Sequence, residues 1–171
     1  MPYNKSKSKG KSFERDIAKF LCSIFDLNFE RVPNSGAFVG GKNVFRTSKI
    51  SEEQKLLMDG DIIVPKELSK FSIECKNYKS FLWHKLFKAN ENKQLNEWLK
   101  QTIQTTKPYW FLCFKITHQS EYVVFDTRLK DYFYIGNYLI YTYNNMDVLI
   151  TDLKLFFEQN KEKILELNDS P

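Results

Sequence analysis

The chain has 171 residues, of which 42% are hydrophobic, 16% aromatic and 27% charged, and its formal net charge is +5. This composition excludes an intrinsically disordered chain, and the small numbers of Gly and Pro residues exclude a low-complexity one. The length predicts one domain with a substantial hydrophobic core.

The apolar segments of the sequence are all short. Even the longest, such as Tyr109 to Phe114, fall far below the length of a membrane span, and no apolar stretch follows the basic N-terminus as it would in a signal peptide. Three scattered cysteines argue against a disulfide framework. We therefore expect a cytoplasmic protein, of a prokaryotic cell or a virus-infected host, with no membrane partner.

Positive charge is concentrated at the start of the chain. The first thirteen residues hold four lysines among Ser and Gly, and no acidic residue. Such a segment can neutralise phosphate groups, but the same composition also fits a solvated tail. We predict a flexible basic arm over residues 1–11 that contacts phosphates through Lys5, Lys7, Lys9 and Lys11.

The N-terminal half of the chain predicts one helix followed by a long polar connection. Apolar residues recur at helical spacing from about Ser12 to Leu27, and Ser12 is a suitable N-cap. An extended stretch, Phe29 to Pro33, leads into a turn at Asn34-Ser35-Gly36. Residues 37–60 are polar, with a weak helical pattern near Glu52 to Met58, and connections this long are usually functional or mobile.

The remaining elements alternate between strands and helices. Asp61 to Val64 and Phe71 to Lys76 are predicted to pair as an antiparallel hairpin. Further along we predict a helix over Glu91–Thr106, strands over Tyr109–Ile116, Glu121–Asp126 and Tyr138–Tyr143, and a final helix over Val148–Leu167. This order predicts an α/β sandwich around one central sheet. We place a core over residues 12–126 and a C-terminal β-α extension, packed on the same domain, over residues 127–171.

The strongest chemical signal lies in the strand that contains Ser72-Ile73-Glu74-Cys75-Lys76. Because side chains alternate along a strand, Glu74 and Lys76 point to one side while Ile73 and Cys75 point to the other. Asp61 opens the preceding strand, where its carboxylate can meet that of Glu74. Two converging carboxylates repel each other, and each raises the pKa of the other, unless a cation lies between them.

Mg²⁺ prefers such a site, with a few carboxylate oxygens, a carbonyl and several waters. Asp61, Glu74 and the main-chain carbonyl of Cys75 supply this set of ligands. Lys76 is placed to orient or deprotonate an attacking water, or to stabilise charge on a phosphate. Together these residues are suited to metal-assisted phosphodiester hydrolysis. An isolated Glu-x-Lys triplet is more often an exposed ion pair, so the surrounding motifs decide between the two interpretations.

Four further motifs accompany this strand in a fixed order. They are Glu14-Arg15 in the first helix, Arg31-Val32-Pro33-Asn34-Ser35-Gly36, Gly60-Asp61-Ile62, and Trp98 with Gln101. The arrangement resembles the PD-(D/E)XK nuclease superfamily, and within it the archaeal-type Holliday-junction resolvases and their phage relatives. The resemblance covers about residues 10–126. Gly60 replaces the usual Pro before the Asp, and the connection from Gly36 to Asp61 is longer than in compact archaeal members.

The resemblance implies a restriction-endonuclease-like fold, a three-layer sandwich with a central mixed sheet flanked by helices. It implies a Mg²⁺-dependent DNA endonuclease, with Mn²⁺ substituting, and with no small-molecule cofactor. Glu14, Asp61, Glu74 and Lys76 would be catalytic, and Glu14 would join Asp61, Glu74 and Cys75 at the metal. Without the resemblance, Glu14 is more simply explained as an acid in the first turn of a helix.

The resemblance also implies a partner and an assembly. Arg15, Arg31 and Ser35 would contact DNA together with the N-terminal lysines, and Gln101 would position a water or DNA. Resolvases cut two strands symmetrically at a branch, which implies a C2 homodimer.

Three other functions remain open at this point. The chain could be a duplex-specific or restriction-like endonuclease that reads DNA through the 37–59 loop, which contains Lys42, Arg46, Lys49 and Lys55. It could also be a DNA-binding module that does not cleave, or a structural component of a phage or plasmid. The acidic cluster argues against the last two, because neither needs clustered acids beside phosphate.

Overall fold

The computed structural model describes residues 5–33 and 59–170, and the side chains of residues 10–33 and 59–170. In chain order the elements are α1 (Lys5–Phe25), β1 (Glu30–Arg31), β2 (Ile62–Ile63), η2 (Lys66–Leu68), β3 (Phe71–Tyr78), η3 (Trp83–Phe87), α3 (Lys93–Thr102), β4 (Tyr109–Ile116), β5 (Glu121–Asp126), η4 (Thr127–Leu129), β6 (Tyr138–Tyr143), β7 (Met146–Asp152) and α4 (Leu153–Asp169). Within these ranges, no helix combines the length and the apolar character that crossing a bilayer requires.

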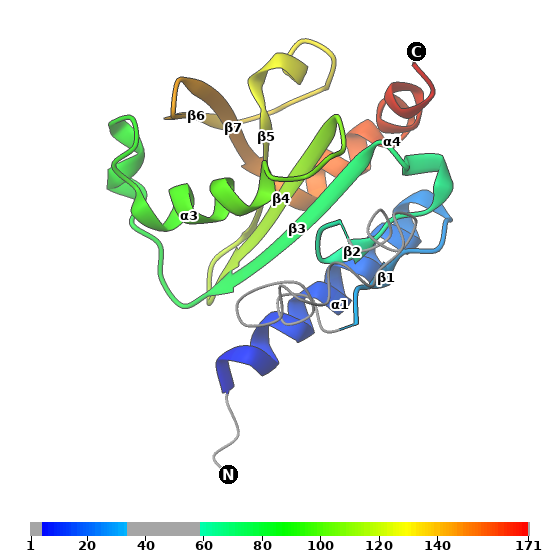
Figure 1. Cartoon of the computed structure of the whole chain (residues 1–171), viewed down its shortest axis with the longest axis horizontal. Helices are drawn as coiled ribbons and strands as arrows, with labels where there is room; N and C mark the ends of the chain where they lie inside the picture. The colour runs from blue at the N-terminus through cyan, green and yellow to red at the C-terminus, as the bar shows by residue number, and fades with distance from the viewer. Residues whose placement is uncertain (1–4, 34–58, 171) are drawn as a thin grey trace.

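One five-stranded mixed sheet forms the centre of the molecule (Figure 1). Its strand order is β3-β4-β5-β7-β6, with β3 parallel to β4 and the other neighbours antiparallel. A short antiparallel ribbon of β1 and β2 lies beside β3 at the edge of this sheet. The bounds of β4, β5 and β6 are those that the sequence predicts.

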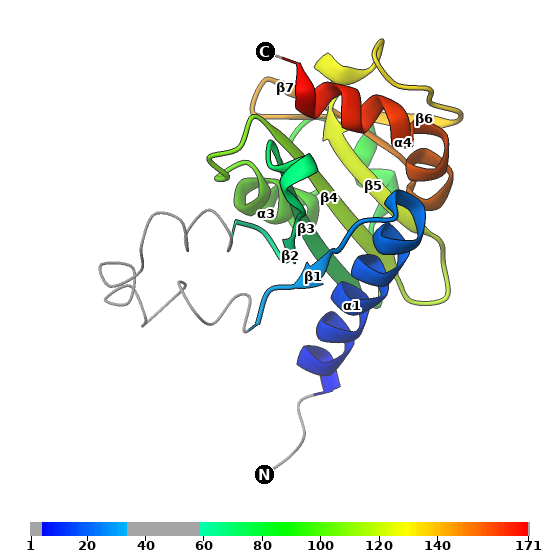
Figure 2. The ribbon, with the colours of Figure 1, turned by 90° about the vertical axis from the view of Figure 1, so that its right-hand side faces the viewer.

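Helices cover both faces of the sheet. Helices α1 and α4 lie on one face and α3 lies on the other, as the two perpendicular views in Figures 1 and 2 show. Two separate clusters of buried side chains correspond to these faces. The predicted α/β class and three-layer, restriction-endonuclease-like sandwich are therefore confirmed.

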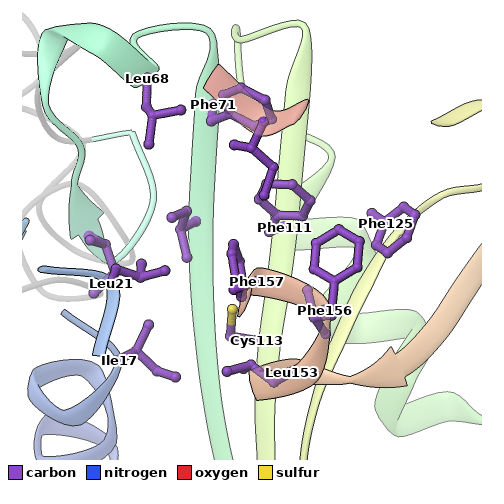
Figure 3. Close-up of a cluster of buried hydrophobic side chains, with 14 of the residues drawn as sticks. Ile17, Leu21, Leu68, Phe71, Phe111, Cys113, Phe125, Leu153, Phe156 and Phe157 are labelled. Carbon is purple, nitrogen blue, oxygen red and sulfur yellow. The ribbon is translucent and has the colours of Figure 1, made fainter. Parts of the chain in front are cut away.

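Strand β4 divides the core because both of its faces are buried. Phe111 and Cys113 point to the α1 and α4 side, whereas Leu112 and Phe114 point to the α3 side. On the first side, the Phe111 ring packs edge-on against the rings of Phe156 and Phe157 of α4, as Figure 3 shows. The near-continuous apolar sequence of β4 follows from this burial on both faces.

Helix α1 begins at Lys5 rather than near Ser12, so Ser12 is not its N-cap. Residues 5–11, predicted as part of a flexible arm, therefore belong to the first helix, and residues 1–4 lie outside the described part of the chain. Lysine favours helix formation, so this polar stretch can extend a helix that the apolar pattern alone would start later. The helix ends just before Asp26, which takes a positive φ of 56°.

The predicted antiparallel hairpin of 61–64 with 71–76 is wrong. Strand β2 pairs with β1 instead, with Arg31 opposite Ile62. Just before β2, Gly60 forms an isolated parallel bridge with Ile73 of β3. The connection through η2 returns the chain to the start of β3 and buries Leu68 in the core, so the two segments run side by side in the same direction.

The predicted helix over Val148–Leu167 is wrong in its first five residues, which belong to β7. Strand β7 is paired on both sides, by β5 and β6, and its apolar run is buried on both faces, a pattern that does not distinguish helix from strand. Asp152 ends the strand and caps α4 by accepting a hydrogen bond from the Leu155 amide at 2.9 Å. Residues 127–171 thus contribute two strands to the main sheet.

A fully buried asparagine fastens the connection before β6 to α4. The Asn160 side chain accepts a hydrogen bond from the Tyr134 amide and donates to the carbonyls of Tyr134 and Phe156, all at 2.7–2.8 Å. Removing this side chain would be costly in stability, because three buried backbone groups would each lose their hydrogen-bond partner.

We predict that Asn160→Ala lowers the free energy of unfolding by about 1–3 kcal/mol in urea titrations, because it leaves those backbone groups unpaired. Gln159→Ala, at the neighbouring exposed position of α4, is the matched control and should change stability little. Equal effects of the two substitutions would contradict the role assigned to Asn160.

Candidate active site

The site is built on the edge of β3 that faces away from β4. This strand is the end of the five-stranded sheet, so its edge away from β4 is open to the segment that carries Asp61. Ser72, Glu74, Lys76 and Tyr78 share the face of β3 that lies on the α3 side, as the register with β4 shows. Glu74 and Lys76 therefore point the same way, as the sequence predicts.

Asp61 is fixed by three hydrogen bonds. Its amide donates to the Ile73 carbonyl at 2.8 Å and its own carbonyl accepts from the Val32 amide at 2.9 Å. Its Oδ2 accepts from the Cys75 amide at 2.9 Å, and the residue is 8% exposed. The main chain of Asp61 is thus joined to both neighbouring segments, and the Cys75 amide of β3 holds the carboxylate through Oδ2, leaving Oδ1 not engaged by Cys75.

Gly60 allows this close approach. Its φ is +90°, and a Cβ atom built on it would lie 2.6 Å from the Ile73 carbonyl oxygen and 3.0 Å from Ser72 Oγ. Both the backbone angle and the lack of space exclude an ordinary side chain. The superfamily's usual Pro has a fixed negative φ, so Gly60 marks a different local backbone before the acid in this chain.

Asp59 anchors the same segment from its other end. Its Oδ2 accepts hydrogen bonds from Thr105 Oγ1 at 2.6 Å and from the Thr106 amide at 3.2 Å, in the connection between α3 and β4. Asp59 and Gly60 were not among the predicted site residues. The signal in the sequence was the short Asp59-Gly60-Asp61 run, in which two acids flank a glycine.

Glu74 and Lys76 form a close ion pair, with 2.6 Å between Oε1 and Nζ. Burial, reinforced by the neighbouring Asp61 carboxylate and opposed in part by Lys76, raises the pKa of Glu74 to about 7. Burial lowers the pKa of Lys76, but the Glu74 carboxylate outweighs this effect and holds that pKa above its usual value. Negative charge is therefore in excess at this site even with the lysine present.

Cys75 contributes backbone groups to the site. Its side chain points to the opposite face, and burial raises the pKa of its thiol well above the usual value, so the thiol stays protonated. Because the side chain points away from Glu74, the main-chain carbonyl is the Cys75 atom that faces the site, in agreement with the predicted ligand atom.

The structure pairs Glu14 with Arg31. The two side chains are 3.1 Å apart, between Oε2 and an Nη atom, and Glu14 is buried on α1. Among the described residues, no three His, Cys, Asp or Glu side chains are close enough together to hold a metal ion. The structure thus brings together Asp61, Glu74 and Lys76, and the role of Glu14 as a third metal-binding acid stays a prediction.

The predicted DNA-contacting residues fall in different places. Lys11 and Arg15 are exposed one turn apart on α1, and exposed Lys19 continues the same stripe, although it was not predicted. Arg31 is partly buried against Glu14. Gln101 is exposed near the end of α3. The side chains of Lys5, Lys7 and Lys9, all of Ser35 and the 37–58 part of the predicted DNA-reading loop lie outside the described residues.

A mixed sheet between helices, with an acid held against an edge strand that carries Glu-x-Lys, defines the PD-(D/E)XK class of nucleases. A family model described as phage putative PDDEXK endonuclease matches residues 5–166, and the chain belongs to this family. It is therefore a nuclease of the PD-(D/E)XK superfamily. No curated protein and no solved structure matches the chain.

We predict that Gly60→Ala lowers the free energy of unfolding by about 1–3 kcal/mol, because alanine at a positive φ is strained and its Cβ would collide with the Ile73 carbonyl. Gly136→Ala is the matched control, since a Cβ there meets nothing nearer than 4.0 Å. Urea unfolding of both variants checks the prediction, and it fails if Gly60→Ala is as stable as Gly136→Ala.

The raised pKa of Glu74 predicts a pH-dependent stability in EDTA. The folded protein keeps the Glu74 proton up to about pH 7, whereas the unfolded chain releases it near the ordinary value of 4.5. Stability is therefore lost as pH rises through this window. Glu74→Gln should be close to the wild type at pH 4.5 and more stable by up to about 3 kcal/mol at pH 8. A difference that does not change with pH, measured by urea unfolding, would contradict the shift.

Proposed function

We propose that this nuclease is a Mg²⁺-dependent DNA endonuclease that acts on four-way or other branched junctions as a homodimer. The observation that carries the metal-dependent part is the pair of carboxylates, Asp61 and Glu74, held beside Lys76 at the open edge of β3. The excess negative charge there, expressed in the pKa of Glu74, is what a divalent cation would neutralise.

The residues present fit a hard divalent cation. Asp61 Oδ1, the Glu74 carboxylate and the Cys75 carbonyl would hold it, a set of oxygen atoms that Mg²⁺ or Mn²⁺ accepts. When bound, the ion would act as a Lewis acid on the phosphate and make a bound water more acidic. The Cys75 amide, by engaging Asp61 Oδ2, fixes the orientation of that carboxylate.

Lys76 would act through its charge. Its pKa lies above the usual value, so the side chain is an ammonium group at neutral pH and cannot serve as a base while Glu74 stays paired with it. Its three N–H donors can position a water and stabilise negative charge on the scissile phosphate. Of the three roles predicted from the sequence, charge stabilisation and water orientation are therefore favoured over deprotonation.

Two features support DNA as the substrate. The chain carries a net charge of +5, and α1 presents the exposed basic residues Lys11, Arg15 and Lys19 on one stripe. Such residues neutralise phosphates without reading sequence. Branched DNA and the homodimer rest on the resemblance to junction resolvases, because two equivalent strands at a branch require two active sites related by symmetry.

We expect a labelled four-way junction to be nicked symmetrically in Mg²⁺ and not in EDTA, while a linear duplex of the same sequence stays intact. Asp61→Asn and Glu74→Gln should abolish cleavage, because each removes a ligand charge, and Lys76→Gln should slow it by roughly 10²–10³-fold. The matched control is Glu121→Gln, which disrupts another partly buried Glu–Lys pair, with Lys115 on the neighbouring strand β4, outside the site.

A second readout does not depend on activity. Mg²⁺ or Mn²⁺ should raise the thermal midpoint of the wild type and of Glu121→Gln at pH 8, but not that of Asp61→Asn or Glu74→Gln. Equal cutting of duplex and junction would contradict the proposed junction specificity but would still support the active site. Wild-type cleavage rates in Glu74→Gln would overturn the site itself.

A further inference from the structure

Tyr78 is the last residue of β3 and lies on the same face as Glu74 and Lys76. Two residues along a strand span about 7 Å, so Tyr78 lies one such step beyond the lysine of the site. Its phenol is close enough to contribute to the pKa of Lys76, after the larger effects of burial and of Glu74. Tyr78 therefore lies next to the site, at the C-terminal end of β3.

The Tyr78 ring is held in place by packing against Trp98. It lies 4.9 Å from the ring of Trp98, at an angle of 44°, and Trp98 is 3% exposed. Trp98 in turn packs against Phe81 and Phe114, so the contact continues into the core on the α3 side. The Tyr78 carbonyl accepts hydrogen bonds from the Thr117 amide at 2.9 Å and from Thr117 Oγ1 at 3.2 Å, which fixes the backbone at this point.

Tyr78 is nevertheless 46% exposed as a residue. The structure shows no hydrogen-bond partner for its hydroxyl among the described residues, so the side chain is held by its ring and backbone alone. An aromatic ring that is already ordered, supported by a tryptophan beneath it and open to solvent, binds a second flat ring with little loss of conformational entropy. Exposed Lys79 follows directly and adds positive charge at the same place.

We propose that Tyr78 is a stacking platform for a nucleobase next to the phosphate at the Glu74–Lys76 site. This inference rests on the proposed function and deepens it, because it specifies the kind of DNA that fits. In an intact duplex each base is already stacked between neighbours, so a protein ring gains a partner only where a base has been freed. Tyr78 therefore selects a branch point or single-stranded segment over continuous duplex.

The test measures binding in EDTA, where no cutting is expected, with the full chain and two probes. One is a four-way junction with 2-aminopurine at the branch, and the other is a linear duplex of the same sequence. Tyr78→Leu keeps apolar cover over Trp98 but removes the aromatic face. It should bind the junction about tenfold more weakly and the duplex unchanged, since stacking on an aromatic side chain contributes about that much per base.

Two further variants separate stacking from other roles of Tyr78. Tyr78→Phe keeps the ring and should bind the junction as the wild type does, which excludes the hydroxyl as the source of affinity. Tyr134→Leu, which removes an exposed tyrosine near α4, should leave binding to both probes unchanged. Thermal midpoints of all variants report whether each one folds.

If Tyr78→Leu does not fold, 2-aminopurine fluorescence with the wild-type protein decides the question. It should fall on binding if the branch base stacks, and an unchanged signal overturns the proposal. Wild-type junction binding by Tyr78→Leu, or equal losses on both probes, also overturns it. Cleavage assays distinguish failure of this proposal from failure of the proposed function. If the wild type cleaves DNA and Tyr78→Leu binds the junction normally, only the stacking role is overturned. If Tyr78→Leu loses junction binding selectively but the wild type does not cleave, only the nuclease mechanism is overturned.

Discussion

The active site depends on the attachment of one short segment to the edge of β3 that faces away from β4. The amide of Asp61 bonds to the Ile73 carbonyl, and its carboxylate accepts the amide of Cys75, so main chain and side chain are both joined to the same strand. These bonds use backbone groups that an edge strand otherwise leaves unpaired. The attachment of the Asp61 segment therefore has two effects. It satisfies polar backbone groups at the edge of β3, and it places an acid beside Glu74.

That contact is possible because the neighbouring residues are adapted to it. Gly60 has no side chain to collide with Ile73, and Asp59 ties the start of the segment to the α3–β4 connection. Val32, after β1, bonds to the carbonyl of Asp61 from the other side. The acid is thus held by three parts of the chain that are distant in sequence, which gives it the rigid support that a preorganised site requires.

The electrostatics of the site reflect a compromise between folding and chemistry. Glu74 is buried beside Asp61 and is compensated only partly by Lys76, which raises its pKa to about 7. Clustered charge of this kind destabilises a fold and is typical of functional sites. Around it, the two aromatic-rich clusters on the faces of the sheet supply the hydrophobic stabilisation that offsets this cost.

Several features of this protein follow from local sequence patterns. Alternation along β3 placed Glu74 and Lys76 on one face, and apolar runs bounded by turn residues located β4, β5 and β6. Motif order was sufficient for the superfamily, because its members share those local patterns. These features follow from the two-residue period of a strand and from local turn chemistry, neither of which requires knowledge of distant partners.

Tertiary structure alone decided the pairing. The buried apolar sequence of β7 fits a helix and a strand equally well. It forms a strand because β5 and β6 provide hydrogen-bond partners on both sides. The Asp61 segment pairs with β1 on one side and runs parallel to β3 on the other, because the connection through η2 returns the chain to the start of β3. Glu14 meets Arg31, and Asp59 meets Thr105, through packing between segments far apart in the chain. Such contacts depend on which backbone and side-chain groups the whole fold leaves without hydrogen-bond partners. A local sequence pattern does not predict which groups these are.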